Sequence, residues 1–221
     1  AAHAFGTIYR GRRVGGFGDI ACFSFDGIKN ITSGEGGCIV TDDPDVLRRV
    51  KEARLLGVEK DTEKRFTSQR SWEFDVTAQG WRYHMSNIMA AIGLKQLGKF
   101  PQMALKRQRL AKLYDSLLAD HEHIHQFFHD YESVVPHIYV VCIEGMKDRK
   151  ELQEIMLQEK NIQTGIHYQP NHWLSLYRDQ NMKNLPVTER YFPKLLTLPL
   201  HPELTEKDVY FIVNSLKDLL Y

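Results

Sequence analysis

Two short apolar runs lie on either side of a lysine and a glycine-rich tetrad. Of all features of the sequence, this arrangement most limits the local folds that the chain can adopt. The runs Ile20–Phe25 and Cys38–Thr41 have the length and composition of buried strands. Between them lies the sequence GEGG, Gly34–Gly37, whose glycines give the backbone freedom for a tight reversal. The pattern therefore predicts two strands joined by a reversal, with Lys29 in the connection.

Lys29 admits two interpretations. A lysine on a surface connection needs no explanation, because such side chains are ordinarily solvated. A fold that removes the amine from water instead favours its neutral, nucleophilic form, which forms Schiff bases with carbonyl compounds. The spacing alone favours the surface interpretation, so the longer sequence around Lys29 decides the matter.

The first half of the chain predicts short strands followed by long helices. The glycine-rich segment Thr7–Gly18 predicts one or two short strands with turns. Asp43 as N-cap and Pro44 at the first helical position begin a helix that ends near Gly57. We further predict a loop over Val58–Gln79, a helix over Ser86–Leu97 and a second helix that opens at Pro101.

From about residue 121 onward, short strands and helices are mixed. A strand is predicted over Ile138–Ile143 and a helix over Asp148–Lys160. Thr205 forms a capping box with Asp208 at the start of a closing helix. This change predicts two domains, residues 1–120 and residues 121–221.

Composition excludes several classes of partner. The 29 basic and 28 acidic residues leave a net charge of +1, so no strongly basic character indicates nucleic acid or an anionic membrane surface as a partner. No apolar run approaches the ~20 residues needed to cross a bilayer. The three cysteines, Cys22, Cys38 and Cys142, lack CxxC spacing, which fits a reducing cytoplasm without a disulfide framework.

The histidine-rich sequence HEHIHQFFH, His121–His129, raises the question of a metal site. Strand alternation would place His121, His123 and His125 on one face. Adjacent positions on one face of a strand rarely converge on a tetrahedral ion. We therefore expect a solvated strand here and no metal site.

Four segments together resemble one family, and they cover essentially the whole chain. The first is GDIACFSFDGIKNITSGEGGCIVTDD, Gly18–Asp43, with a lysine five residues after the serine of a strand that ends in Ser-Phe. The others are Gly80–Leu97, Asn161–His172 and Leu185–Val209. In order and spacing they are similar to the DegT/DnrJ/EryC1/StrS family of pyridoxal-phosphate (PLP) aminotransferases that act on nucleotide-linked keto-sugars.

The resemblance implies a fold and an activity. The fold would be α/β, a partial PLP-transferase large domain of the aspartate aminotransferase-like fold type I, followed by a small α+β C-terminal domain. The activity would be transfer of an amino group, with glutamate as the expected donor, to a nucleotide-linked keto-deoxysugar. Members work in bacterial surface polysaccharide synthesis, including that of lipopolysaccharide, as cytoplasmic homodimers with sites at the dimer interface.

The resemblance also assigns roles around the cofactor. Lys29 would form the Schiff base with PLP and then move the proton between the cofactor and the substrate carbon. Ser24 would hydrogen-bond the cofactor phosphate, and His3 would lie against the ring near its phenolic oxygen. Arg82 stands where the family reaches across the dimer interface to the partner's phosphate. Asn is common at that place, but a guanidinium also binds phosphate well.

The small domain would supply His167 and Tyr168 to the nucleotide-sugar. Glu35 could be catalytic, although shaping the turn is its simpler role. Trp81 and Tyr83 could line the sugar pocket or pack at an interface.

The family pairs the PLP ring nitrogen with an aspartate that lies immediately before the Ala-Ala-His stretch, whereas this sequence begins at Ala1. We therefore expect the C-terminal part of an aminotransferase, and the alternative is a truncated, non-catalytic interaction module that cannot bind PLP. PLP-dependent sugar dehydratases of the family carry histidine in place of the lysine, and Lys29 argues against that activity.

Overall fold

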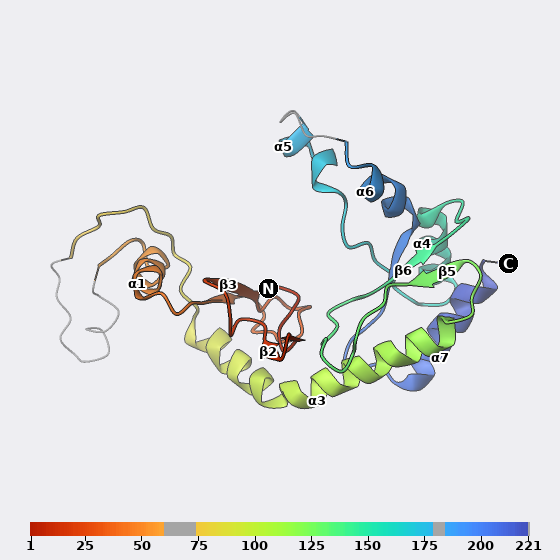
Figure 1. Ribbon diagram of the computed structural model, residues 1–221, viewed down its shortest axis with the longest axis horizontal. Coiled ribbons are helices and arrows are strands. Elements are labelled where there is room, and N and C mark those ends of the chain that lie inside the picture. Colours follow the sequence, from red (N-terminus) through yellow and green to blue (C-terminus); the bar gives the residue numbers. More distant parts are fainter. Residues whose placement is uncertain (60–73, 179–183, 221) are drawn as a thin grey trace. The chain divides into compact units, whose positions relative to one another are not determined.

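The computed structural model describes residues 1–59, 74–178 and 184–220 (Figure 1). These residues form two compact units, Ala1–Pro101 and Gln102–Tyr221. The assignment of residues 1–120 and 121–221 to two functional domains stays a prediction, because compactness does not assign a function. Among the described residues, no helix combines the length and the apolar character that crossing a membrane requires.

The first unit contains two small antiparallel hairpins and a capped helix. Asp43 caps the helix, because its side chain accepts hydrogen bonds from the backbone N–H groups of Asp45 and Val46. The predicted short strands, paired strands and capped helix are therefore confirmed. They are β1 (Ile8–Tyr9), β2 (Arg12–Arg13), β3 (Ala21–Ser24), β4 (Gly37–Val40) and α1 (Pro44–Ala53).

The expectation that β3 and β4 are buried is wrong. Every residue of the two strands is half-buried or exposed, and Ile39 keeps 43% of its surface. The physical reason is the size of the sheet. Within the described ranges the two strands pair only with each other, from Ala21 opposite Val40 to Ser24 opposite Gly37. The loop predicted over Val58–Gln79 lies largely outside the described residues.

The two helices predicted around Pro101 are one helix, α3 (Asn87–Leu118), with the proline inside it. An internal proline removes one helical hydrogen bond and costs about 3 kcal/mol. Packing on both sides of the proline offsets this cost. Phe100 is buried beside it, and further along Leu110, Tyr114 and Leu118 are almost fully buried.

The second unit is built on a three-stranded antiparallel sheet in the order β5–β6–β7. The strands are β5 (Ile124–Gln126), β6 (Tyr139–Ile143) and β7 (Leu195–Leu198), and the long helices are α4 (Arg149–Gln158) and α7 (Glu206–Asp218). Asp148 caps α4, and Thr205 forms the predicted capping box with Asp208. The strand and both helices predicted here are confirmed.

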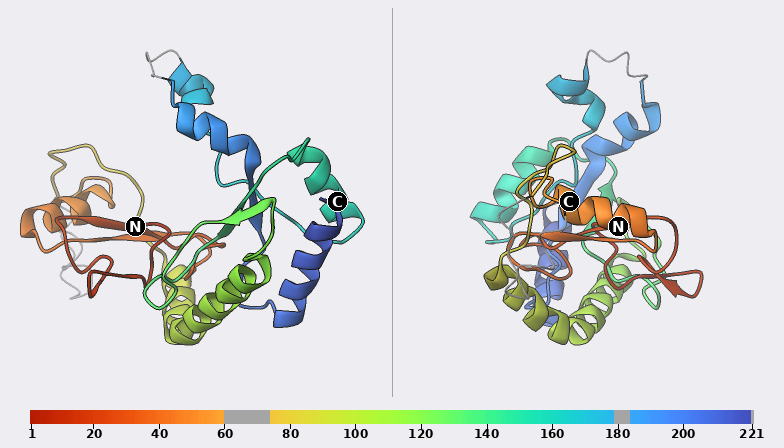
Figure 2. Two further views of the ribbon diagram at one scale, coloured as in Figure 1. Left: turned by 45° about the vertical axis from the view of Figure 1, so that its right-hand side comes forward. Right: turned by 90° about the vertical axis from the view of Figure 1, so that its left-hand side faces the viewer.

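Between α4 and β7, the residues that the structure describes include four short helical segments. Figure 2 shows α5 and α6 projecting away from the three-stranded sheet. His172 and Glu189 join the two sides of this projection by a hydrogen bond of 2.9 Å. The segments are η1 (Asn171–Trp173), α5 (Ser175–Arg178), α6 (Pro186–Tyr191) and η2 (Phe192–Lys194).

The core of the second unit contains two polar anchors. The Tyr139 hydroxyl donates to Asp115 Oδ1 over 2.5 Å, and the Tyr114 ring stacks on that of Tyr139. Arg107, with 4% of its surface exposed, donates to the carbonyl oxygens of His137 and Leu200 at 3.1 and 2.9 Å. Burial lowers the pKa of Arg107 to about 10, so the side chain stays charged at neutral pH.

We predict that Tyr139→Phe destabilises the protein by about 2 kcal/mol at pH 7, since a hydrogen bond to a carboxylate is lost. Burial raises the pKa of Asp115, and the hydrogen bond from Tyr139 opposes that rise. Without this bond, the ionised form of Asp115 is less stable in the variant than in the wild type. The loss is smaller in a buffer of about pH 4 than at pH 7, because Asp115, with its raised pKa, takes up protons as the pH falls through the acid range. Urea unfolding at both pH values measures the difference. Tyr210→Phe, on the exposed side of α7, is the control and changes stability by less than about 0.5 kcal/mol.

Candidate active site

The loop between β3 and β4 is folded back on the hairpin that carries it. Phe25 anchors it, because its N–H donates to Gly36 O at 2.8 Å and its carbonyl accepts from Ser33 N at 2.9 Å. The Thr32 hydroxyl donates to the same carbonyl at 3.2 Å. The loop therefore has a fixed path, and Lys29 stands within it.

The glycines of the GEGG sequence are favoured at their positions for different reasons. Gly34 and Gly36 have φ angles of +86° and +144°, which side-chain-bearing residues rarely adopt. Gly37 has no such angle, but a Cβ there would lie 2.5 Å from the carbonyl oxygen of Phe23. Gly37 is therefore required because the two strands approach closely at this point.

Lys29 is half-buried, and its amine contacts an imidazole from the start of the chain. The Nζ atom of Lys29 lies 3.0 Å from Nε2 of His3, which is exposed. The Lys29 backbone N–H donates to Asp26 O at 3.1 Å and fixes the residue in the loop. The structure thus brings together two of the residues predicted to surround a cofactor.

Ser24 ends β3, just before the Lys29 loop. Its hydroxyl accepts a hydrogen bond from the Asp26 N–H at 3.3 Å. A hydroxyl that accepts one bond still has its own proton to donate. Ser24 is half-buried, so a phosphate oxygen at the end of the strand would find a donor there.

Phe5 places the start of the chain against the hairpin. Its ring makes edge contacts with Phe23, Phe25 and Phe100, with centroids 5.4, 6.2 and 4.9 Å apart. The Asn30 side-chain amide donates to the Phe5 carbonyl at 3.4 Å. Phe5 therefore holds His3 near Lys29. Phe5 was not predicted, although the alternation of Phe23 and Phe25 in the sequence CFSF was an available signal for an aromatic partner.

These residues fit PLP. The cofactor needs a primary amine for its aldehyde, a donor for its phosphate and polar contacts at its ring oxygen. Lys29, Ser24 and His3 supply groups of these three kinds on adjoining segments of one unit.

Arg82 belongs to a different segment of the first unit, which pairs with the end of α1. Leu55 and Arg82 form an isolated antiparallel bridge. On either side of Arg82, the Trp81 N–H donates to Ala53 O at 2.6 Å and the Tyr83 N–H donates to Arg54 O at 2.9 Å. The Trp81 and Tyr83 rings stack 6.0 Å apart, and Arg82 itself is exposed.

His167 and Tyr168 lie in the second unit. His167 is half-buried, and its Nδ1 lies 3.0 Å from the Thr197 hydroxyl of β7. Tyr168 keeps 55% of its surface exposed, and its ring meets that of His167 edge-on at 4.7 Å. Thr197 was not predicted. A polar residue in the middle of the apolar run LLTLPL was the available signal.

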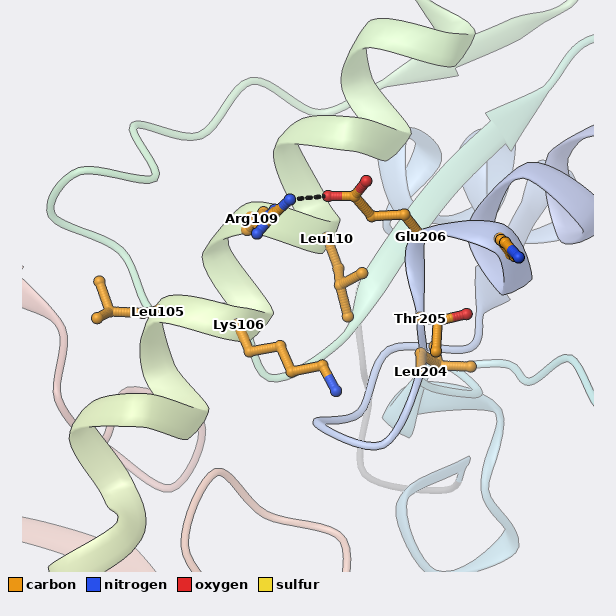
Figure 3. A pocket seen from close by; sticks show the side chains of 8 residues that line it. Leu105, Lys106, Arg109, Leu110, Leu204, Thr205 and Glu206 are labelled. Atoms are coloured by element: carbon orange, nitrogen blue, oxygen red, sulfur yellow. Dashed lines mark ion pairs between the residues drawn. The ribbon is translucent and has the colours of Figure 1, made fainter.

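An open depression of about 720 Å³ lies elsewhere in the second unit, between α3 and the start of α7 (Figure 3). Arg109 and Glu206 form an ion pair across it at 2.5 Å. It contains none of the predicted site residues. Its lining is Leu105, Lys106, Arg109, Leu110, Leu204, Thr205, Glu206 and Lys207.

Within the described ranges, no group of three or more histidine, cysteine, aspartate or glutamate side chains is placed to hold a metal ion. His125 lies in β5, while His121 and His123 precede that strand. The His121 and His123 rings contact each other with centroids 6.5 Å apart.

Comparison with known proteins identifies relatives over the full length of this chain. The sequence profile of the DegT/DnrJ/EryC1/StrS aminotransferase family matches residues 1–217. The spore coat polysaccharide biosynthesis protein SpsC of Bacillus subtilis is 31% identical over 227 residues, which cover 100% of this chain and 58% of SpsC.

Two solved structures show the same fold. The putative sugar aminotransferase Spr1654 of Streptococcus pneumoniae, in its PLP form, superposes with a TM-score of 0.87 at 29% identity, over 99% of this chain and 56% of its own. Helicobacter pylori PseC, an aminotransferase involved in pseudoaminic acid biosynthesis, also gives 0.87 at 29% identity, over 99% and 57%. The predicted fold type I class is confirmed, and the chain spans a little over half the length of these relatives.

We predict that Gly37→Ala disrupts the hairpin, whereas Gly34→Ala is tolerated. The first change places a methyl group 2.5 Å from a backbone carbonyl, at a cost of about 3 kcal/mol. The second has open space and costs only the left-handed φ, about 1 kcal/mol. Amide hydrogen exchange at Phe25 and Ser33 is the measurement. Equal protection in both variants would contradict the close approach at Gly37.

Proposed function

This chain belongs to the DegT/DnrJ/EryC1/StrS aminotransferase family, and we propose that it is the part of a PLP-dependent sugar aminotransferase that carries the reactive lysine. The reaction moves an amino group, with glutamate as the expected donor, to a nucleotide-linked keto-deoxysugar. The names of SpsC and PseC support a place in the synthesis of a surface polysaccharide or related glycan. We further propose lipopolysaccharide as one such glycan and the cytoplasm as the compartment.

The observation that carries the proposal is the contact between Lys29 and His3. A lysine on an ordinary surface loop has no need of a glycine-constrained path or of an imidazole 3.0 Å from its amine. Members of the family use PLP, and the solved forms of Spr1654 include one with PLP and one with pyridoxamine phosphate. These observations support the proposed role of the Lys29 amine as the group that holds the cofactor.

Three residues of the chain have separate roles in the proposed reaction. When bound, PLP supplies an aldehyde and an electron-withdrawing ring that stabilises negative charge on the substrate carbon. The Lys29 amine holds the cofactor and afterwards carries the proton to and from that carbon. Through an unprotonated Nε2, His3 accepts a hydrogen bond from the amine and orients it. The Ser24 hydroxyl donates to the cofactor phosphate.

Arg82 binds the cofactor phosphate of a second copy of the protein in a homodimer. Its exposure and the rigid pairing of its segment with α1 support this role. A planar guanidinium offers two parallel donors to a phosphate. His167 and Tyr168 bind the nucleotide-sugar, to which they offer an imidazole and an exposed phenol.

We expect borohydride reduction of the full-length protein with PLP to label Lys29 selectively, as read by peptide mass spectrometry. Lys29→Ala removes the label. Lys51→Ala, a change in the last turn of α1, is the matched control and leaves it in place. Addition of glutamate before the reduction converts the bound cofactor to its amine form and prevents labelling. Labelling spread over surface lysines, or a folded protein without a label, would instead support the non-catalytic module.

A further inference from the structure

The hairpin of β1 and β2 concentrates positive charge on a fixed piece of backbone. Its two turn residues, Arg10 and Gly11, have φ angles of +49° and +74°. Positive φ angles at both central residues are typical of the type I′ turn, which joins two paired strands tightly. The segment Thr7–Gly18 contains three arginines and no acidic residue, whereas the whole chain has a net charge of +1. This hairpin therefore carries a local excess of positive charge on a tight turn.

Two of the three arginines lie on one face of the hairpin. Tyr9 pairs with Arg12, and residues directly opposite each other in antiparallel strands point to the same face. The Arg10 guanidinium lies over the Tyr9 ring, with its Cζ atom 5.2 Å from the ring centroid. Arg13 pairs with Ile8, and because side chains alternate along a strand, this pair points to the opposite face.

Two aromatic rings lie between the guanidinium groups of this face. The Arg12 Cζ atom lies 5.6 Å from the centroid of the Phe17 ring, and the Tyr9 and Phe17 ring centroids are 6.0 Å apart. Both Cζ distances are within the ~6 Å of a cation–π contact. An arginine therefore stands at each end of an aromatic pair. We call these four residues, Tyr9, Arg10, Phe17 and Arg12, the arginine–aromatic face.

Neither arginine of this face forms an ion pair with a carboxylate in the part of the chain that the structure describes. By contrast, Arg48 Nη1 lies 3.2 Å from Glu52 Oε2. A guanidinium that stacks on a ring keeps N–H donors in its own plane, and Arg12 gives one of them to the Gly16 carbonyl. The face therefore offers two positive charges and further donors, and both arginines are exposed.

The composition of this face fits a protein partner better than a small anion. Tyrosine and arginine are among the residues that contribute most to binding energy in protein–protein interfaces. Tyr9 keeps 53% of its surface exposed, and its ring would gain apolar contact with a protein side chain but little with a phosphate group.

We propose that the arginine–aromatic face binds an acidic segment of another protein. Carboxylates of that segment accept hydrogen bonds from Arg10 and Arg12, and an apolar side chain of the same segment packs on Tyr9. A guanidinium already held against a ring loses less freedom when it binds a carboxylate than a freely moving one does. The inference does not depend on the proposed aminotransferase function.

The first test measures how the full-length protein binds a fluorescein-labelled peptide of glutamates around a central leucine, by fluorescence anisotropy in low-salt buffer. We expect Arg10→Gln/Arg12→Gln to bind about tenfold more weakly than the wild type. Arg10→Lys/Arg12→Lys binds about threefold more weakly, because lysine keeps the charge and lacks the planar fork. Tyr9→Val, which keeps both charges and loses the ring, also binds about threefold more weakly. Wild-type affinity in the lysine variant, or a wild type that does not bind, would overturn the proposal.

The matched control is Arg13→Gln/Arg49→Gln. It removes the same amount of charge, half from the opposite face of the hairpin and half from an exposed position of α1. We expect its affinity for the peptide to stay close to that of the wild type, and thermal unfolding shows that each variant is folded. An affinity as low as that of Arg10→Gln/Arg12→Gln would mean that net charge governs binding, which would overturn the proposal.

The second test separates an acidic protein segment from other occupants of the face. A peptide with glutamine in place of glutamate is expected not to bind, and tripolyphosphate is expected to displace the labelled peptide less well than the unlabelled peptide does. Analytical ultracentrifugation is expected to give the wild type and Arg10→Gln/Arg12→Gln the same sedimentation coefficient. Binding of the glutamine peptide, better displacement by tripolyphosphate or a smaller species in the variant would each overturn the proposal. The last two results would assign the face to a phosphate ligand and to contact between copies of this chain, respectively.

Discussion

The close approach of Gly37 to the Phe23 carbonyl is the constraint on which the lysine site depends. It sets the register of β3 and β4, and the register fixes where the intervening loop leaves and returns. The loop then closes on Phe25 through backbone hydrogen bonds, so the position of Lys29 follows from the geometry of the hairpin. The Lys29 amine is only half-buried, and the two-stranded sheet that carries its loop has no buried residue in either strand. The position of Lys29 therefore depends on backbone geometry more than on the burial of its own side chain.

The features that could be predicted from the sequence are those encoded locally. Asp43 with Pro44, and Thr205 with Asp208, define helix starts because each cap involves residues within three positions of one another. The continuity of α3 could not be predicted, since the proline signal is local but the energy that overrides it comes from packing. Tyr114 and its neighbours bury their side chains against residues far away in the sequence.

In the candidate site, too, the residues within a local sequence pattern were predicted, and those that depend on distant contacts were not. The segment around Lys29 carries a long and specific pattern, so the proposed roles of Lys29 and Ser24 were predicted from it. Phe5 and Thr197 were missed, because their roles depend on contacts with residues 18 or more positions away. The distribution of burial was also mispredicted. Apolar composition indicates which residues prefer to be buried, but not whether the described chain supplies a layer to cover β3 and β4.

Two kinds of glycine occur in this chain, those with a positive φ angle and those that lie close to other atoms without one. Gly34 and Gly145 have positive φ angles and nothing near them, so they serve the path of the backbone. Gly37, Gly80 and Gly165 have no such angle, and each would place a Cβ within 3.1 Å of another atom. They lie in the Lys29 hairpin, two residues before Arg82 and two residues before His167 respectively. With a Cβ, Gly37 and Gly80 would each crowd the backbone of another segment, whereas Gly165 would crowd the ring of His167 in its own segment. Gly37 and Gly80 therefore let two segments approach each other without a side chain between them, beside the lysine and the arginine to which the proposed reaction assigns its groups.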